Sequence, residues 1–298
     1  MKSTPFLTLI IALAVLVMSG CTGGSRVSEA GERDALKLSD FDISDARVEV
    51  IRDGFLQLSD VYVSPSGLIY AVDAMRHYLY RMDPDAGIID SIGGRGQGNT
   101  QFWGPVSVHA TNDLKIFVQD AGNGRIQMFD RRFQFLGSLA MVGGSVMISQ
   151  SPSVGISVNR AGGVVFWDEG ESRVVGSTSS YAIDKTFDPN VSQIQIPPTK
   201  LREIPDGFVI LDVNGQHLHR FAENGRYLGF LSGFGQILDV SITSTEYILL
   251  SSEFIISMSS TGQINNIIRH SIQNPKIIAH YKSGLIVGTS TKLLMVVI

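Results

Sequence analysis

The sequence predicts an all-β protein, a six-bladed β-propeller in which a strand near the N-terminus closes the last blade. Three observations support this fold. A pattern of four short apolar strands recurs along the chain at spacings of 38 to 47 residues. The pattern occurs six times, and its last copy lacks a fourth strand. The apolar-alternating residues 47–51, RVEVI, stand just before the first full copy and can supply the missing strand.

The first residues of the chain are expected to be an export signal. Lys2 precedes an apolar run at residues 6–18 that is too short to span a membrane comfortably, so residues 1–20 are predicted to be a signal peptide. Cys21, the only cysteine, follows directly, and the stretch MSGC resembles the lipobox of bacterial lipoproteins. This pattern predicts cleavage before Cys21 and lipidation of its thiol, palmitate included. The alternative is an ordinary signal peptide followed by a chance cysteine.

Polar residues dominate the segment after this cysteine. Residues 21–46 show no sustained apolar period, which predicts a flexible tether, and residues 47–298 are expected to form one large propeller domain. The formal net charge is −4, and loss of Lys2 with the signal makes it more negative. No basic excess is available to bind a nucleic-acid backbone, so nucleic acid is not an expected partner. The propeller is expected to be monomeric.

The repeat is clearest between its first two copies. Residues 61–92 align without a gap on residues 108–139 at an offset of 47, which places IYAVD over IFVQD and YLYRMD over RIQMFD. Later copies follow at residues 164–168, 208–212, 240–264 and 277–298. Each full copy predicts an inner strand, a second strand ending in aspartate, a third strand and a fourth. The fifth and sixth copies have lost the aspartate.

The last copy lacks its fourth strand, which is expected to come from elsewhere in the chain. Residues 47–51 are expected to pair with residues 292–298 and to complete the sixth blade. This pairing would close the ring and cover LLMVVI, which would otherwise form an exposed apolar edge.

These features resemble a known repeat family. GGRGQGNTQFWGP and IFVQDAGNGRIQMFD resemble the glycine-rich linker and the Asp-x-x-Asn-x-Arg-Ile signature of NHL repeats. The match is best over residues 59–140, fair to residue 231 and weak beyond it. With its lipobox, the chain resembles the six-bladed propeller lipoproteins of Bacteroidetes-type bacteria. Related propellers include lactonases and an amidoglycolate lyase that hold metals at the channel, so the resemblance also raises an enzymatic alternative.

The glycines of residues 94–98 suggest a phosphate-binding loop, but the surrounding sequence opposes this interpretation. A dinucleotide fingerprint starting at Gly94 would need glycine where Asn99 stands, and no amphipathic helix follows. A similar G-x-G-Q recurs at residues 233–236, again between a fourth strand and the next inner strand. The sequence therefore predicts blade-to-blade linkers, with Phe102 wedged between blades and Pro105 starting an inner strand.

Aspartates close several of the predicted second strands. They are expected to cap the following turn by accepting backbone N–H bonds, and they lie on separate blades, too far apart to share one metal ion. The four positions are Asp73, Asp120, Asp168 and Asp212. Arg125, together with Asn123, is expected to support one of these turns.

His217 and His219 alternate on one predicted strand, where both rings could chelate zinc from the same face. No third ligand is evident from the sequence, and two structural histidines facing a neighbouring blade are the favoured interpretation. We therefore expect no metal, no cofactor and no catalytic residue.

Polar side chains on the predicted inner strands are candidates for lining the channel. They are Asp60, His109, Glu203 and Asp239. Because both faces of each blade are buried, such residues need polar partners. They are either structural or the lining of a central polar pocket.

Four further residues mark a candidate binding face, formed by the linkers and the turns between second and third strands. They are Arg76, His77, Trp103 and Arg125. Pockets are expected where this face meets the channel. An exposed tryptophan beside arginine is typical of an interface anchor. The alternative is that Trp103 packs on the neighbouring blade.

The predicted function is a lipid-anchored, non-enzymatic binding or scaffold module for an envelope protein, peptide or glycan. The expected location is the cell envelope, at the periplasmic face of the outer membrane. The alternative is a metal-dependent hydrolase or lyase similar to the lactonase and amidoglycolate-lyase propellers. Such enzymes need several convergent ligands on inner strands, and the inner strands here offer few. A purely structural role in the envelope also stays open.

Overall fold

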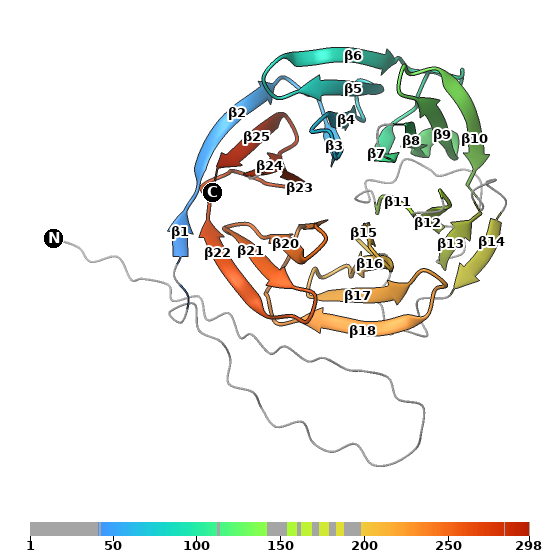
Figure 1. Ribbon diagram of the computed structural model, residues 1–298. Helices are drawn as coiled ribbons and strands as arrows, with labels where there is room; N and C mark the ends of the chain where they lie inside the picture. The colour runs from blue at the N-terminus through green and yellow to red at the C-terminus, as the bar shows by residue number, and fades with distance from the viewer. Residues whose placement is uncertain are drawn as a thin grey trace, which may run out of the picture.

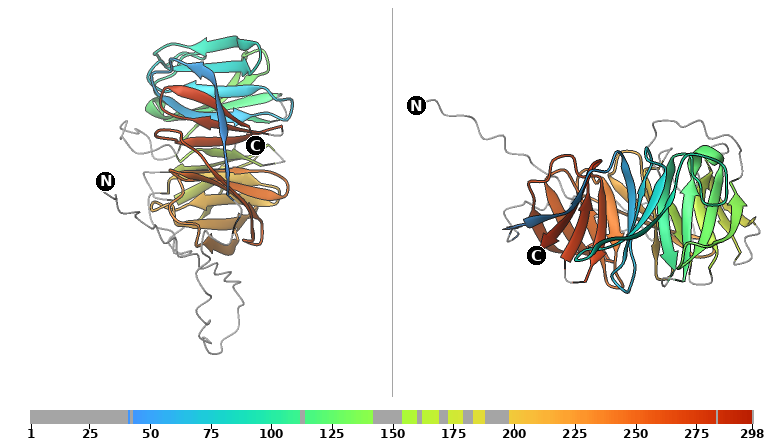
Figure 2. Two further views of the ribbon diagram at one scale, coloured as in Figure 1. Left: turned by 90° about the vertical axis from the view of Figure 1, so that its left-hand side faces the viewer. Right: turned by 90° about the horizontal axis from the view of Figure 1, so that it is seen from above.

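The computed structural model describes residues 41, 43–111, 114–141, 154–159, 162–168, 173–178, 183–187, 198–282 and 284–297. Their strands form six sheets, five with four strands and one with five, arranged in a ring (Figure 1). Seen from the side, the ring is a disc across which the strands run (Figure 2). The predicted six-bladed β-propeller is confirmed.

Blades one to three follow chain order, and the first strand of each blade lies innermost. Blade one contains β3 (Leu58–Val63), β4 (Ile69–Asp73), β5 (Tyr78–Asp83) and β6 (Gly87–Gly93). Blade two contains β7 (Pro105–Thr111), β8 (Lys115–Asp120), the 3-10 helix η2 (Ala121–Asn123), β9 (Arg125–Asp130) and β10 (Phe135–Ala140). Blade three contains β11 (Ile156–Val158), β12 (Val164–Asp168), β13 (Arg173–Ser177) and β14 (Ile183–Phe187).

Blades four to six continue the ring, and the last two recruit strands from the N-terminal segment. Blade four contains β15 (Lys200–Ile204), β16 (Gly207–Leu211), β17 (His217–Ala222) and β18 (Tyr227–Ser232). Blade five contains β19 (Asp239–Ile242), β20 (Glu246–Leu250), β21 (Phe254–Ser259), β22 (Ile264–Arg269) and β1 (Ile43–Asp45). Blade six contains β23 (Ile277–Tyr281), β24 (Gly284–Gly288), β25 (Lys292–Val297) and β2 (Arg47–Asp53).

The N-terminal segment closes the ring as predicted. Strand β2 pairs antiparallel with β25, with Arg47 opposite Val297, so the apolar C-terminal strand has no free edge. The structure adds β1, which pairs parallel with β22 on blade five. This strand falls within residues 21–46, the range assigned to the tether, so the folded part begins earlier than the sequence predicted. Together β1 and β2 link the outer edges of blades five and six (Figure 1).

Apolar side chains pack between adjacent blades in six clusters, one at each junction of the ring. Phe102 is fully buried between blades one and two, which confirms the predicted wedge. Phe55 and Phe234 occupy the corresponding places between blades six and one and between blades four and five. Burial of one such ring stabilises the fold by roughly 1.5–3 kcal/mol, so the linkers contribute directly to blade packing.

The aspartates that end second strands fix the turns that follow them. The carboxylate of Asp73 accepts the backbone N–H of Arg76 at 3.0 Å and that of Leu56, in the preceding linker, at 2.8 Å. Asp212 likewise accepts the N–H of Gln216 at 2.9 Å. The predicted capping is confirmed for these two turns, and the Asp73 carboxylate also holds the linker that enters blade one.

Within the described residues, no helix has the length and apolar character needed to cross a membrane.

Candidate functional site

An ion triad lies at the centre of the ring. Arg202 on β15 directs its Nη2 atom at two carboxylates, with distances of 3.1 Å to Asp60 Oδ1 and 3.1 Å to both oxygens of Asp239. The two aspartates come from β3 and β19, on opposite sides of blade six (Figure 1). We call these three residues the channel triad. It joins inner strands that are far apart in the sequence.

Hydrogen bonds extend the channel triad to the remaining three blades. Asp60 Oδ2 accepts the Ser107 hydroxyl of blade two at 2.6 Å, and Ser107 Oγ accepts the backbone N–H of Ile156 of blade three at 3.3 Å. Asp239 Oδ2 accepts the backbone N–H of Ile278 of blade six at 3.0 Å. One polar network therefore contacts all six inner strands, and each buried carboxylate has several donors.

The charge balance of the channel triad depends on its arginine. Burial alone would lower the pKa of Arg202, but the attraction of Asp239 and Asp60 outweighs burial and raises it. The Asp60 and Asp239 side chains are 4% and 0% exposed, so water screens little of their charge. The guanidinium is thus a permanent internal cation that neutralises part of two buried anions.

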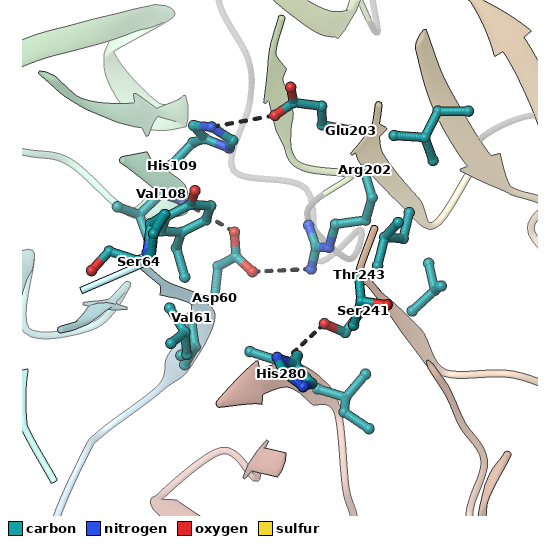
Figure 3. A pocket seen from close by; sticks show the side chains of 18 of the residues that line it. Asp60, Val61, Ser64, Val108, His109, Arg202, Glu203, Ser241, Thr243 and His280 are labelled. Carbon is teal, nitrogen blue, oxygen red and sulfur yellow. Dashed lines mark hydrogen bonds and ion pairs between the residues drawn. The ribbon is translucent and has the colours of Figure 1, made fainter. Parts of the chain in front are cut away.

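A pocket of about 600 Å³ lies on the ring axis next to the channel triad (Figure 3). Residues of all six inner strands line it, Asp60 and Arg202 among them, together with turns that join first and second strands. The walls include many apolar side chains, among them Val61, Val63, Ile204, Ile242 and Ile278. In β3 the pocket is lined by Asp60 and the residues after it, and not by the residues that precede it toward the linker. The channel triad therefore forms the inner end of the pocket.

His109 and Glu203 both line the pocket and point toward each other, with 3.7 Å between His109 Nε2 and the Glu203 carboxylate (Figure 3). The His109 side chain is 10% exposed, and its ring lies against the ring of Tyr62, with centroids 4.5 Å apart. Burial lowers the pKa of His109 to about 4, with a further decrease from Arg202 that is opposed by Asp60. His109 is therefore neutral at physiological pH, so its contact with Glu203 is not an ion pair.

The four predicted channel residues come together in this region. Asp60, His109 and Glu203 line the pocket, and Asp239 joins them through the channel triad. The sequence analysis missed Arg202. A signal was available, because it is the only arginine on the six inner strands, and two aspartates on those strands needed a cation.

His280 and Ser241 complete the polar lining on the side of blades five and six. The Ser241 hydroxyl accepts the backbone N–H of His280 at 2.9 Å, and the His280 side chain is exposed (Figure 3). The pocket thus has apolar walls and a few convergent polar groups, which is the usual make-up of a small-ligand site.

The residues of the predicted binding face lie among the linkers and second-to-third-strand turns and do not line the pocket. Arg76 pairs with the buried Asp73 at 3.5 Å and donates to the Gly54 carbonyl at 3.0 Å. His77 accepts the backbone N–H of Gly104 through Nδ1 at 3.0 Å. Both side chains therefore hold linkers in place.

The other two residues of that face make similar contacts. Trp103 packs over Gly122, where an added Cβ would come within 2.9 Å of the indole Cγ, and Arg95 lies 5.6 Å from the ring centroid. Arg125 pairs with Asp120 at 3.0 Å, as expected for turn support. We expected pockets to form where this face meets the channel, and that expectation is corrected. The pocket borders the opposite turns, because the channel triad fills the axis on the linker side.

His217 and His219 lie side by side on blade four, with ring centroids 5.9 Å apart. The structure brings Asp212 to them as a third polar group, with Oδ2 at 2.7 Å from His217 Nδ1. The sequence analysis missed this grouping, because Asp212 was interpreted only as a turn cap. The predicted lipidation site, Cys21, lies outside the described residues.

Comparisons with known proteins support the fold and leave the activity open. No protein-family model and no curated protein matches the sequence, so the resemblance to NHL repeats stays a prediction. Among solved structures, a gluconolactonase of Xanthomonas campestris is similar with a TM-score of 0.62 and 13% identity, covering 96% of this chain and 97% of that chain. Virginiamycin B lyase of Staphylococcus aureus is similar with a TM-score of 0.54 and 12% identity, covering 81% and 80%. The WD40 repeats of RRP9 are similar with a TM-score of 0.62 and 8% identity, covering 86% and 99%.

These neighbours include two enzymes and one repeat propeller, and all share the blade architecture at identities that are too low to carry function across. Function must therefore be argued from the site itself.

Proposed function

We propose that this protein is a lipid-anchored envelope propeller that binds a short segment of a protein, peptide or glycan in its axial pocket, without catalysing a reaction there. The observation that carries the proposal is the placement of Arg202 between Asp60 and Asp239. A metal-dependent hydrolase needs inner-strand carboxylates that are available to an ion. Here a guanidinium contacts both carboxylates, and a divalent ion beside it would meet strong repulsion.

The pocket itself supports binding. Its volume falls within the range of small-ligand sites, and apolar side chains form much of its wall. Glu203 and Ser241 are positioned to accept or donate hydrogen bonds to a hydroxyl or amide group of a ligand. A peptide segment or a sugar unit offers both apolar surface and such polar groups, which suits this composition.

The cellular setting of the proposal rests on the N-terminal sequence. MSGC at residues 18–21 supports a lipid on Cys21, and the setting that we propose is the periplasmic face of the outer membrane. The lipobox, together with the NHL-like linker at residues 93–105 and the turn sequence at residues 116–130, supports a relationship to the six-bladed propeller lipoproteins of Bacteroidetes-type bacteria.

An assay of metal-dependent turnover tests the enzymatic alternative directly. The full-length protein in detergent would be assayed for hydrolysis of a sugar lactone with added Ca²⁺, Mg²⁺, Mn²⁺ or Zn²⁺. The control is the D60N/D239N variant, which keeps the shape of both side chains. We expect no metal-dependent turnover above that control. Turnover that requires a divalent ion and is lost in the control would establish the hydrolase instead.

A further inference from the structure

A second cluster of polar side chains lies on blade four, apart from the pocket lining. It consists of Asp212, at the end of the second strand, and of His217 and His219 on β17. Each residue offers one ligand atom, and the three atoms lie within 4.8 Å of one another. Asp212 and His219 are buried, and the His217 side chain is 36% exposed. One edge of the cluster is thus open to solvent.

The partner of the aspartate at the end of the second strand differs between blade four and blades two and three. In blade two the corresponding aspartate, Asp120, pairs with Arg125 at 3.0 Å, and in blade three Arg173 lies 3.4 Å from Asp168. Blade four has His217 at the arginine position. A permanent cation is therefore replaced by an imidazole, which carries no fixed charge. The buried Asp212 carboxylate has lost the compensation that its counterparts keep.

His219 adds an atom that needs a partner. It is 3% exposed and occupies the position that Gln127 has in blade two. Its Nδ1 lies 3.1 Å from the Tyr227 hydroxyl, whereas its Nε2 is buried with no hydrogen-bond partner in the described structure. If Nδ1–H donates to the hydroxyl, Nε2 presents a bare lone pair, which is the form of histidine that ligates metals.

We propose that Asp212, His217 and His219 form a zinc site. Two imidazole nitrogens and one carboxylate oxygen suit Zn²⁺, whereas Ca²⁺ and Mg²⁺ prefer oxygen ligands throughout. Ligand atoms of a tetrahedral zinc are about 3.3 Å apart, so the observed spacing requires only small side-chain movements. The fourth position would face solvent beside His217 and take water. The ion would also supply the positive charge that arginine supplies in blades two and three.

The surroundings hold these ligands in orientation. Asp212 Oδ1 accepts the backbone N–H groups of Gln216 and His217, which fixes the carboxylate and leaves Oδ2 toward the histidines. The ring of Phe230 packs against both imidazoles, at 5.0 Å from the centroid of His217 and 5.8 Å from that of His219. The Tyr227 hydroxyl, 3.1 Å from His219 Nδ1, can orient this imidazole in the manner of an outer-shell partner.

The test measures zinc binding by the full-length protein after dialysis against EDTA. Calorimetric titration is expected to give one zinc per chain, and Co²⁺ is expected to give the visible absorption of a tetrahedral site. The H217R/H219Q variant copies the residues of blade two, so it should fold and bind zinc at least 100-fold more weakly. H280A removes an exposed histidine of the pocket and should leave the stoichiometry unchanged.

Tyr227→Phe gives a second readout that keeps all three ligands. Loss of an outer-shell partner is expected to weaken zinc binding about 10- to 100-fold. The proposal would be overturned by a wild-type protein that binds no stoichiometric zinc. Zinc binding as tight in H217R/H219Q or in Tyr227→Phe as in the wild type would overturn it equally.

Discussion

Replacing Arg202 with methionine tests whether the channel triad holds the ring together. Methionine keeps most of the length of the side chain and removes the charge, so the change leaves two buried carboxylates without their cation. Removal of one partner from a buried ion pair costs about 3–5 kcal/mol. Asp60 keeps its bonds from Ser107 and Val108, and Asp239 keeps those from Val240 and Ile278. We therefore expect the lower end, about 3 kcal/mol.

That cost should be visible in thermal unfolding. For a domain of this size, 1 kcal/mol shifts Tm by roughly 2–4 °C, which predicts a loss of about 6–12 °C at neutral pH. The matched control is R202M/D60N/D239N, in which no charge of the channel triad is left and most of the lost stability should return. An R202M protein that melts within about 2 °C of the wild type would refute the reasoning.

Three further predictions concern the closure, the anchor and the buried imidazole. Deleting residues 45–52 should expose the edge of β25 and cause aggregation or loss of a cooperative melt, and a monomeric deletion variant with unchanged Tm would contradict the closure. Cys21→Ser should release the protein from membranes and block lipid labelling, so a variant that still fractionates with membranes would exclude the lipobox. Because the pKa of His109 is lowered to about 4 from 6.5, the unfolded chain takes up this proton first as pH falls. Stability should therefore decrease by roughly 3 kcal/mol between these two values, as measured by denaturant midpoints, and His109→Gln should remove that dependence.

The repeat made most of the fold predictable from the sequence. A gapless offset placed the strands of blade two from those of blade one, and the missing fourth strand of the last copy pointed to residues 47–51. Strand β1 was not predictable in the same way. It has only three residues and pairs in parallel with β22, so neither a turn nor a long apolar alternation marks it.

The candidate site was predictable only in part. Asp60, His109, Glu203 and Asp239 were identified because charged side chains on buried inner strands require partners. Arg202 was missed although it is the neighbour of Glu203 on the same strand, because only the closed ring shows which inner-strand side chains meet, here Arg202 and Asp60 at 3.1 Å. The face of the ring on which the pocket opens depends on the same contact between Arg202 and Asp60, because the channel triad fills the axis on the linker side.

Ligand binding in the pocket is the most direct test of the account. The full-length protein would be titrated with a panel of defined oligosaccharides and short peptides, alongside two tryptophan variants. His280→Trp places an indole in the pocket from an exposed position, and Met75→Trp places one on the opposite face, where the side chain is 59% exposed. We predict saturable binding of at least one ligand class, weakened at least 10-fold by His280→Trp and unchanged by Met75→Trp. Binding that is lost in Met75→Trp and kept in His280→Trp would contradict the account and move the site to the linker face.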